Sequence, residues 1–569
     1  MERLHPRQQC GEIGVPAGEA VDRRGRCGRG RARRGGRRPG GLHRRQRRWR
    51  AASHEREDAG RGDEAHRHIV RLRTILPRGA RTYDRRVSSP AAIVANGNVE
   101  IASGVRAGRL PELDGLAPMD VAERLRPLAG LSLLESARPG RNAVWSYLTA
   151  DPRAVLDRAS DGADPFAAAR AAVRRLSREA SPDDAGPRFL GGLVGYLGYD
   201  LGRRFERLPS IALDDQPLPE LRLQLHDWAL AHDRRTGEWW LGGRALDGDV
   251  AGLERRLAAV RELVLAPGRA PASVVAREQV PEAAAPATFA FSSGLSRATY
   301  EAGVEAIRAA IARGEIYQAN LTRRLETAFD GDPWPLYRAL RTGDPALFAA
   351  FLPLDADGRR AIVSASPEPF LSVTADGRVA TDPIKGTRPR GRDRADDRRL
   401  ACELLESEKD RAENTMIVDV LRNDLGRVCV PGSVRVPRLC RLERTAAVQH
   451  LVSTVTGQLE PGRDAFDLLA AAFPGGSITG APKIRAMELL ERLEPVRRGP
   501  YTGAAGWIGP DGGMQTSILI RSFVADGRRL TLHVGGGITW RSDPAAEWQE
   551  TIDKARGPLT AIGGVELPS

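Results

Sequence analysis

Lysine is nearly absent from this chain. There are four lysines, Lys385, Lys409, Lys483 and Lys554, against eighty-three arginines. Arginine therefore serves wherever only a positive charge is needed, and a retained lysine points to chemistry that a guanidinium cannot perform. An ammonium can lose its proton and become a nucleophile or a base, whereas a guanidinium stays charged in proteins. Chance retention is the alternative for any one lysine, but all four lie in stretches that other features also single out.

Cysteine and long apolar runs are scarce as well. The five cysteines are Cys10, Cys27, Cys402, Cys429 and Cys440, and their spacing is not that of metal ligands. Such a pattern indicates a reducing compartment. No apolar run reaches the roughly eighteen residues of a membrane span, and the arginine-rich start lacks the apolar core of a signal peptide. We therefore expect a cytoplasmic protein that does not contact a membrane.

The positive charge is concentrated at the start of the chain, where acidic residues are too few to balance the arginines. The net charge is +14, but residues 1–90 hold twenty-five arginines against ten acidic residues, so the remainder is close to neutral. This Arg- and Gly-rich segment has little apolar surface to bury, which predicts disorder. We interpret it as an over-extended start of the reading frame, with a nucleic-acid-binding tail as the alternative. The neutral remainder predicts no basic groove for nucleic acid.

The rest of the chain has the composition of a globular protein. We expect an N-terminal subdomain at 91–265, a Pro- and Ala-rich linker at 266–290 and a catalytic domain at 291–566. Strands are predicted at 131–136 and 144–148, and helices at 250–265 and 297–313. The glycines of 189–196 indicate close backbone packing, because a side chain would not fit there. The second helix is expected to stop at Gly314.

A polar strand face is predicted directly after that helix. In the stretch 315–322, alternation places Gln318 and Asn320 on one face and Tyr317 and Leu321 on the other. Two amides on one face suggest the floor of a polar cavity. A solvent-facing strand surface is the alternative.

Two predicted helices each carry two carboxylates on one face. The first helix spans 407–421, and Pro544 would start the second. The carboxylates, three residues apart in each pair, are Asp410 and Glu413 on the first helix and Glu547 and Glu550, followed by Lys554, on the second. Two such pairs can hold a hard divalent cation such as Mg²⁺. Each pair alone is more often a solvated helix face, so the prediction depends on their occurring together.

The stretch 473–483 combines glycines with a predicted helix start. Pro482 falls in the expected first turn, where free backbone N–H groups can hold an anion. It is not a nucleotide-binding loop, because Ala481 and Pro482 intervene before Lys483 and no Lys-Ser/Thr pair follows. A carboxylate is the better ligand.

Further anion contacts are predicted from one arginine and three glycines. Arg521 falls on a predicted strand, where a buried arginine is rare without a partner. The backbone of Gly535-Gly-Gly537 allows a ligand to approach closely. His450, taken in isolation, is interpreted as a core histidine. Together, the carboxylate pairs with Mg²⁺, the arginine, the lysine and the glycine amides describe a site for a small dianion.

The ordered motifs resemble the chorismate-utilising enzymes, the family that contains anthranilate synthase component I and aminodeoxychorismate synthase component I. The matching patterns are Tyr317-Gln-Ala-Asn-Leu, Ser366-Pro-Glu, Pro383-Ile-Lys-Gly-Thr, Ala412-Glu-Asn, Gln449-His-Leu, Thr479-Gly-Ala-Pro-Lys, Ile520-Arg and Gln549-Glu-Thr-Ile-Asp-Lys-Ala. The similarity covers about residues 95–565. It implies a large α/β (α+β) fold of antiparallel sheets packed face to face, with helices outside and the N-terminal subdomain packed intimately on the catalytic part.

Within the family, Lys385 favours the aminodeoxychorismate branch, since the anthranilate and isochorismate branches usually have alanine there. Gln318 agrees, because isochorismate and salicylate synthases place a water-activating lysine at that position. The resemblance thus implies conversion of chorismate and ammonia to 4-amino-4-deoxychorismate, for 4-aminobenzoate and folate synthesis. The alternatives are anthranilate synthase component I, and a non-catalytic paralogue or arginine-tail nucleic-acid binder.

The resemblance also implies roles for individual residues. Glu368 would protonate the departing 4-hydroxyl of chorismate, Lys385 would add to C2 as a neutral amine, and His450 would lie near the leaving hydroxyl. Glu413 and Glu550 would bind Mg²⁺, with Asp410 and Glu547 as outer or water-mediated partners. The implied substrate-binding residues are Gln318, Thr387, Gly480, Tyr501, Arg521, Gly535, Gly536, Gly537 and Lys554, with Tyr501 and Arg521 taking the enolpyruvyl carboxylate.

Two residues depart from the family pattern, and two activities are missing from the chain. Pro369 stands where the family usually has arginine, and Arg541 where an acid usually precedes Ser542. The body contains no Gly-x-Cys-x-Gly glutaminase elbow, so ammonia is expected from a separate glutaminase subunit. A separate aminodeoxychorismate lyase is expected downstream.

Overall fold

The computed structural model describes residues 98–102, 104–140, 143–179, 186–266, 289–445 and 448–568. The expectations for residues 1–90 lie outside the described residues, as does 267–288 of the expected linker. Among the residues that the structure describes, every helix is too short or too polar to span a bilayer.

The first of two large sheets has fourteen strands and is mostly antiparallel, although β10 and β24 pair in parallel. Its order is β1 (Asn98–Ala102), β2 (Val105–Arg109), β9 (Glu238–Arg244), β8 (Trp228–Asp233), β4 (Trp145–Thr149), β3 (Ser132–Glu135), β12 (Phe348–Pro353), β13 (Ala361–Ser366), β22 (Ser522–Ala525), β23 (Arg529–Ile538), β11 (Gln318–Ala328), β10 (Phe289–Ser293) and β24 (Gly564–Glu566), with β19 (Gly480–Ala481) beside β11.

The second sheet has ten strands and is antiparallel. Its order is β16 (Ile384–Pro389), β18 (Val448–Gln458), β15 (Arg378–Thr381), β14 (Pro369–Val373), β21 (Met514–Ile518), β20 (Ala504–Ile508), β6 (Gly192–Leu197), β7 (Leu221–His226) and β5 (Ala154–Leu156), with β17 (Arg435–Arg444) beside β18.

Both sheets run through strands from the two sides of the 266–290 stretch. In the first sheet Leu133 of β3 lies opposite Phe351 of β12, and in the second Val194 of β6 lies opposite Trp507 of β20. The intimate packing of the N-terminal part on the rest is therefore confirmed, because the two share hydrogen-bonded sheets.

The sheets pack face to face across a common apolar core. One buried cluster joins Tyr147, Ala350 and Val524 of the first sheet to Val194 and Trp507 of the second. The Tyr147 ring meets Trp507 edge-on, with ring centroids 6.0 Å apart. Side chains from alternate positions of both sheets fill this layer.

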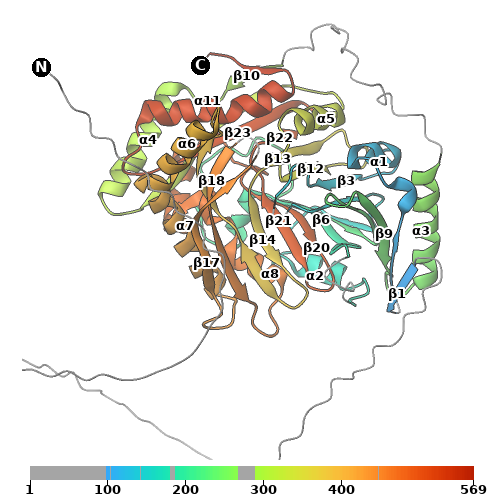
Figure 1. Ribbon diagram of the computed structural model, residues 1–569. Helices are drawn as coiled ribbons and strands as arrows, with labels where there is room; N and C mark the ends of the chain where they lie inside the picture. Colours follow the sequence, from blue (N-terminus) through green and yellow to red (C-terminus); the bar gives the residue numbers. More distant parts are fainter. Residues whose placement is uncertain are drawn as a thin grey trace, which may run out of the picture. The chain divides into compact units, whose positions relative to one another are not determined.

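Helices cover the outer faces (Figure 1). Against the first sheet lie α1 (Pro118–Leu125), α3 (Val250–Leu265), α5 (Pro333–Gly343) and α11 (Pro544–Ala561). Against the second lie α2 (Ala167–Val173), α7 (Glu408–Gly426) and α8 (Ala465–Ala472). The others are α4 (Arg297–Ala312), α6 (Arg394–Glu406), α9 (Gly476–Thr479), α10 (Lys483–Leu493) and the 3₁₀ helices η1 (Pro111–Leu113) and η2 (Tyr199–Arg204).

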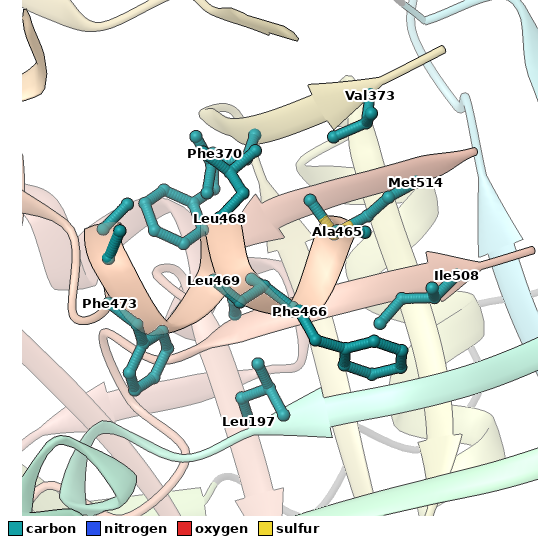
Figure 2. Packing of buried hydrophobic residues seen from close by; sticks show 14 of the residues in the cluster. Leu197, Phe370, Val373, Ala465, Phe466, Leu468, Leu469, Phe473, Ile508 and Met514 are labelled. Atoms are coloured by element: carbon teal, nitrogen blue, oxygen red, sulfur yellow. The ribbon is translucent and has the colours of Figure 1, made fainter. Parts of the chain in front are cut away.

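Helix α8 shows how this outer packing works (Figure 2). Asp464 caps its N-terminus by accepting hydrogen bonds from the N–H groups of Phe466 and Asp467. Leu468 and Leu469 then point to the ten-stranded sheet, where Phe370 of β14 belongs to the same buried cluster. The cap fixes the start of the helix and the apolar face holds it on the sheet.

The predicted helices are confirmed where their periodicity was clear. Helix α3 has the predicted bounds, and α4 buries Tyr300, Val304 and Ile307 before the left-handed Gly314 (φ 74°). Helix α7 runs five residues beyond the predicted end at Leu421. The predicted strand at 315–322 was wrong at its start, because β11 begins only at Gln318.

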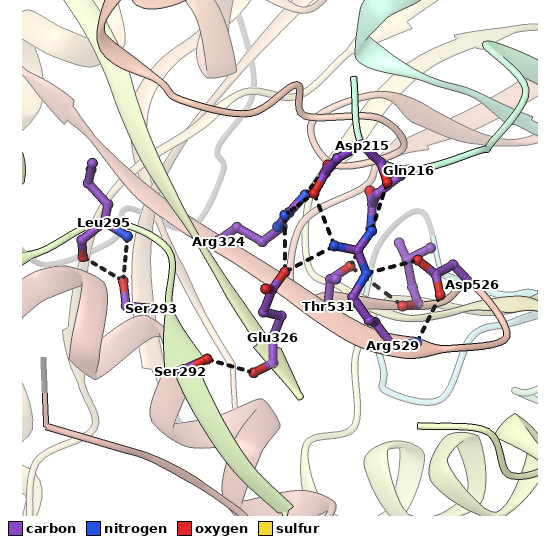
Figure 3. A network of polar contacts seen from close by, with 11 residues as sticks. Asp215, Gln216, Ser292, Ser293, Leu295, Arg324, Glu326, Asp526, Arg529 and Thr531 are labelled. Carbon is purple, nitrogen blue, oxygen red and sulfur yellow. Dashed lines mark hydrogen bonds and ion pairs between the residues drawn. The ribbon is translucent and has the colours of Figure 1, made fainter. Parts of the chain in front are cut away.

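A charged network also links the N-terminal part to the first sheet (Figure 3). Asp215 accepts two hydrogen bonds from Arg324 of β11, at 2.7 and 2.6 Å, and one from Arg529 of β23 at 3.0 Å. These charged hydrogen bonds, led by those of Arg324, lower the pKa of Asp215 to about 2. The loop before β7 is thereby fixed to the strands that carry the candidate site.

Candidate active site

Lys385 and Glu368 meet at Ser477. Lys385 lies on β16, and its Nζ donates a hydrogen bond to the backbone oxygen of Ser477 in α9 at 2.9 Å. Glu368, in the turn between β13 and β14, is buried, and its carboxyl is hydrogen bonded to the Ser477 side chain. Burial raises the pKa of Glu368 above its ordinary value, although Lys385, Ser477 and Lys554 act in the opposite direction. The two predicted catalytic groups are therefore brought together, with Glu368 inclined to keep its proton.

The four predicted metal ligands lie on α7 and α11, as expected, but two of them form ion pairs with Lys409 and Lys554. Lys409 Nζ lies 3.5 Å from Glu547 Oε1, and Lys554 Nζ lies 2.7 Å from Glu550 Oε1. In the described part of the chain no three His, Cys, Asp or Glu side chains form a ready-made metal site. Asp410 is also occupied, since Arg388 donates to it at 3.3 Å.

These carboxylates nevertheless fit a divalent cation. Glu413 Oε1 is buried and has no hydrogen-bond partner within the described residues. Burial raises the pKa of Glu413. The charges of Lys385 and Lys409 act in the opposite direction, and those of Asp410 and Glu547 raise the pKa further. Oxygen donors that repel one another, one of them buried and unpaired, are the donor set that Mg²⁺ prefers.

Strand β23 brings its glycines against these acids. A Cβ on Gly536 would lie 3.1 Å from Glu547 Oε2 and 3.5 Å from Glu550 Oε1. Lys554 Nζ donates to the backbone oxygen of Gly535 at 2.8 Å. The glycine stretch therefore lies against the acids of α11, and its predicted contact with an anion stays a prediction.

The two amides predicted to share a strand face lie on β11, which pairs with the glycine stretch of β23. Gln318 and Asn320 are both buried, which excludes the solvent-facing alternative. A Cβ on Gly537 would lie 2.1 Å from Gln318 Nε2, so the glycine makes room for this amide. Gln318 Oε1 is buried and has no hydrogen-bond partner in the described part of the chain. Gly480 of β19 pairs with Ala319 and completes this corner.

His450 lies beside Thr387 on the neighbouring strand. Its Nδ1 is 2.9 Å from Thr387 Oγ1. Burial lowers the pKa of His450 to about 4, and the charges of Arg521 and Arg138 act in the same direction. The imidazole is therefore neutral at ordinary pH, and it is only half-buried rather than a core histidine.

Arg521 is not the buried strand arginine that the sequence predicted. It forms a bend between β21 and β22 with φ 49°, in the left-handed region, and its side chain is 43% exposed. Its guanidinium lies 3.7 Å from Asp344. The hydrophobic run on both sides of Arg521 concealed this turn.

Tyr501 is buried and held by aromatic stacking. Its ring lies on His533 of β23, with centroids 5.0 Å apart and planes 20° from parallel. Nearby Arg498 donates to Glu494 and to the backbone oxygens of Ile478 and Asn320. Sequence reasoning missed Ser477, His533 and Arg498. Their contacts with the candidate site join them to residues that are distant in the chain.

Lys483 and the two residues that depart from the family pattern, Pro369 and Arg541, have other surroundings than the predicted site residues. Lys483 Nζ is 2.8 Å from Asp424 Oδ2 in a largely buried ion pair, which is a structural role. Pro482 is the N-cap of α10 rather than a residue of its first turn. Arg541 pairs at 3.4 Å with Glu408 on the surface, and Pro369 begins β14.

A family model described as chorismate binding enzyme matches residues 132–560. The chain belongs to this family. Aminodeoxychorismate synthase component 1 of Salmonella typhimurium is 43% identical over 391 residues, covering 69% of this chain and 81% of that protein. Anthranilate synthase component 1 of Streptomyces coelicolor is also 43% identical, over 445 residues covering 76% and 84%.

Solved structures of chorismate binding enzymes share the fold. Anthranilate synthase component I from Streptococcus pneumoniae superposes with a TM-score of 0.63 at 30% identity, covering 74% of this chain and 93% of that one. The two face-to-face sheets with helices outside are thus the fold of the family.

Proposed function

We propose that the protein converts chorismate and ammonia to 4-amino-4-deoxychorismate. The observation that carries the proposal is the contact of Lys385 and Glu368 with the same residue, Ser477. A primary amine and a carboxyl with a raised pKa at one point are the nucleophile and the acid that this substitution needs.

Lys385 and Glu368 would act in two balanced steps. In the first, the neutral amine of Lys385 forms a bond to C2 while the C4–O bond breaks, and the Glu368 proton leaves with the hydroxyl as water. In the second, ammonia forms a bond to C4 while the C2–N bond to Lys385 breaks, which restores the free amine. The new C4 ammonium can return a proton to Glu368.

Substrate binding would use the groups around this pair. The glycine backbone of β23, Lys554 and the unpaired amide of Gln318 would hold the ring carboxylate end. Tyr501 and Arg521 would take the enolpyruvyl carboxylate. Neutral His450, held by Thr387, would lie near the departing hydroxyl.

Mg²⁺ is the proposed cofactor. Glu413 and Glu550 would hold it, with Glu547 and Asp410 outside them, after Lys409 and Lys554 release their carboxylates. When bound, the ion would offset the negative charge of the substrate carboxylate. A glutaminase subunit would supply the ammonia, and a separate lyase would release 4-aminobenzoate, in folate biosynthesis.

Anthranilate synthase is the second candidate, because the Streptomyces coelicolor relative is as similar in identity. The test incubates the protein with chorismate, Mg²⁺ and ammonium, with and without added aminodeoxychorismate lyase. Lyase-dependent 4-aminobenzoate supports the proposal. Lyase-independent anthranilate as the main product contradicts it and supports the second candidate.

A further inference from the structure

A bend in the backbone presents Arg521 to the candidate site. Its φ of 49° is costly for a residue with a side chain and is found where the surroundings enforce it. Two contacts enforce it here. The Arg521 backbone oxygen accepts a hydrogen bond from the Ala365 N–H at 3.1 Å, and the adjacent Ser522 hydroxyl donates to Ser364 at 2.7 Å. Both partners lie on β13, the strand that leads to Glu368, so the backbone of Arg521 is fixed relative to the acid.

The side chain of Arg521 is less constrained than its backbone. It is 43% exposed, and its guanidinium lies 3.7 Å from the carboxylate of Asp344. That distance is too long for a hydrogen bond, so the pair leaves the N–H groups of the guanidinium available to a ligand. Burial lowers the pKa of His450, and the charge of Arg521 lowers it further, which places the guanidinium near His450.

Asp344 is held more firmly than its partner, because it ends α5 where that helix packs on α11. Its N–H donates to the Leu340 backbone oxygen at 2.8 Å, and Pro345 follows, which cannot continue the helix. On α11, a Cβ on Gly557 would lie 3.3 Å from Asp344 Oδ2, so the glycine makes room for the carboxylate. Backbone and packing therefore fix the acid, whereas the guanidinium can move.

The carboxylate of Asp344 also lacks a hydrogen bond that it could accept. Its Oδ2 is buried and has no hydrogen-bond partner within the described ranges. A buried polar atom without a partner is unfavourable, and Arg521 is the cation beside this one. A small movement of the guanidinium would satisfy it. Because a guanidinium carries N–H groups on more than one edge, one edge can face Asp344 while another binds a second carboxylate.

We propose that Asp344 is a positioning residue for the substrate: it draws Arg521 into the orientation in which the free edge of the guanidinium meets the enolpyruvyl carboxylate. The inference rests on the proposed function, in which Arg521 binds that group. An acid near a dianion repels it, so attraction is not what Asp344 contributes. It contributes order, because an arginine already held by one edge loses less rotamer freedom when the substrate binds.

The test is a double-mutant cycle between the two residues. Asp344→Ala removes the carboxylate, Arg521→Met removes the guanidinium, and the double variant removes both. Asp344→Asn keeps an oxygen acceptor in the same place without the charge. Steady-state kinetics with chorismate, saturating ammonium and Mg²⁺ give kcat and KM for each protein, and thermal unfolding gives its stability.

Asp332→Ala is the matched control. Asp332 caps the opposite end of α5 by accepting a hydrogen bond from the Trp334 N–H. Its loss weakens the same helix at the end away from Arg521, so it should lower the unfolding temperature and leave the KM for chorismate unchanged.

We expect Asp344→Ala to raise the KM for chorismate by about three- to tenfold with kcat within about twofold, because ordering one long side chain costs that much affinity. Asp344→Asn should raise KM less, since its amide oxygen still accepts from Arg521. Arg521→Met should raise KM by about tenfold or more, through the loss of charged hydrogen bonds. In that background Asp344→Ala should change KM by less than about twofold, because Asp344 acts only through Arg521.

Three results would overturn the positioning role. Additive effects in the double variant would assign Asp344 to the packing of α5. An unchanged KM in Asp344→Ala would show that Arg521 needs no partner. A lower KM in that variant would show that the acid only repels the substrate.

Failure of the proposed function is distinguishable from these results. A wild-type protein that makes no aminated product from chorismate and ammonium contradicts the function. Calorimetric titration of the same variants with chorismate, in the absence of ammonium, measures affinity without turnover, so the cycle still decides the role of Asp344.

Discussion

The guanidinium of Arg498 lies 4.5 Å from the ring centroid of Tyr199. Arg498 is buried and follows α10, whereas Tyr199 begins η2 in the N-terminal part. A hydrogen bond joins the same two segments, because the Tyr199 N–H donates to the Gly499 backbone oxygen at 2.7 Å. Since Arg498 also donates to the backbone of Asn320 and Ile478, it joins the N-terminal part to both walls of the candidate site.

Replacing Arg498 by methionine is therefore expected to destabilise the protein strongly. The substitution leaves Glu494 buried without its ion-pair partner, which costs about 3–5 kcal/mol. Urea unfolding measures the change. The neighbouring Arg497→Ala, which loses a partly exposed pair with Asp214 and a hydrogen bond to Ser210, should cost less than about 1 kcal/mol. Equal losses for both variants would contradict the buried role of Arg498.

Such contacts mark the limit of what the sequence predicts. Helix α4 and the two carboxylate pairs follow from spacing within one helix, which is local information. The Arg498–Tyr199 contact joins residues almost three hundred positions apart, and nothing in either segment encodes it. Lys483 shows the reverse error, since its rarity suggested chemistry but Asp424 fixes it as a structural cation. Arg521 was misplaced because its bend lies inside an apolar run.

Asp215 is expected to make the protein sensitive to acid. Its pKa is lowered to about 2, so its contribution to stability is present above its unfolded pKa of about 4 and is lost as pH falls toward 2. Asp215→Asn should cost about 1–2 kcal/mol at neutral pH, after allowance for solvent screening. Urea unfolding at pH 7 and pH 3 measures this. The cost should shrink at pH 3, and the exposed neighbour Asp214→Asn should show little change at either pH.

Metal dependence is expected to follow the buried carboxylates. Activity should be lost in excess chelator and return with Mg²⁺, because four acids facing a dianionic substrate would otherwise repel it. Glu413→Gln should weaken Mg²⁺ binding about tenfold or more, read from the Mg²⁺ concentration for half-maximal turnover. Glu408→Gln on the same helix, 82% exposed at its side chain, is the control and should leave it unchanged. Full activity in chelator would contradict the assignment.

The pH profile should report Glu368 on its alkaline side. Burial raises the pKa of Glu368, and the acid must be protonated to act, so kcat/KM should fall as pH rises through this raised value. On the acidic side, protonation of Glu413 and Glu547, whose pKa values are also raised by burial, should weaken metal binding. Glu368→Gln should lose about 10²–10⁴-fold in kcat, and its residual activity should lack the alkaline limb. An unchanged alkaline limb in that variant would exclude Glu368 as its source.

Substitutions of Lys385 can distinguish a covalent role of its amine from a merely electrostatic one. Arginine keeps the positive charge but cannot attack carbon, so Lys385→Arg should lose aminodeoxychorismate formation nearly as fully as Lys385→Ala, by about 10³-fold or more. Lys385→Ala removes the nucleophile and opens space at C2, so ammonia can add there directly and divert part of the turnover to anthranilate.

Mass spectrometry supplies the direct measurement. Wild-type enzyme denatured after brief exposure to chorismate should carry an adduct on the peptide that contains Lys385, and both variants should lack it. Lys409→Arg is the control, because Lys409 pairs with Glu547 by its charge and a hydrogen bond, and arginine can supply both. It should retain the adduct and most of the turnover. Near-normal aminodeoxychorismate synthesis by Lys385→Arg would contradict the covalent mechanism, because a guanidinium in that position can only neutralise charge.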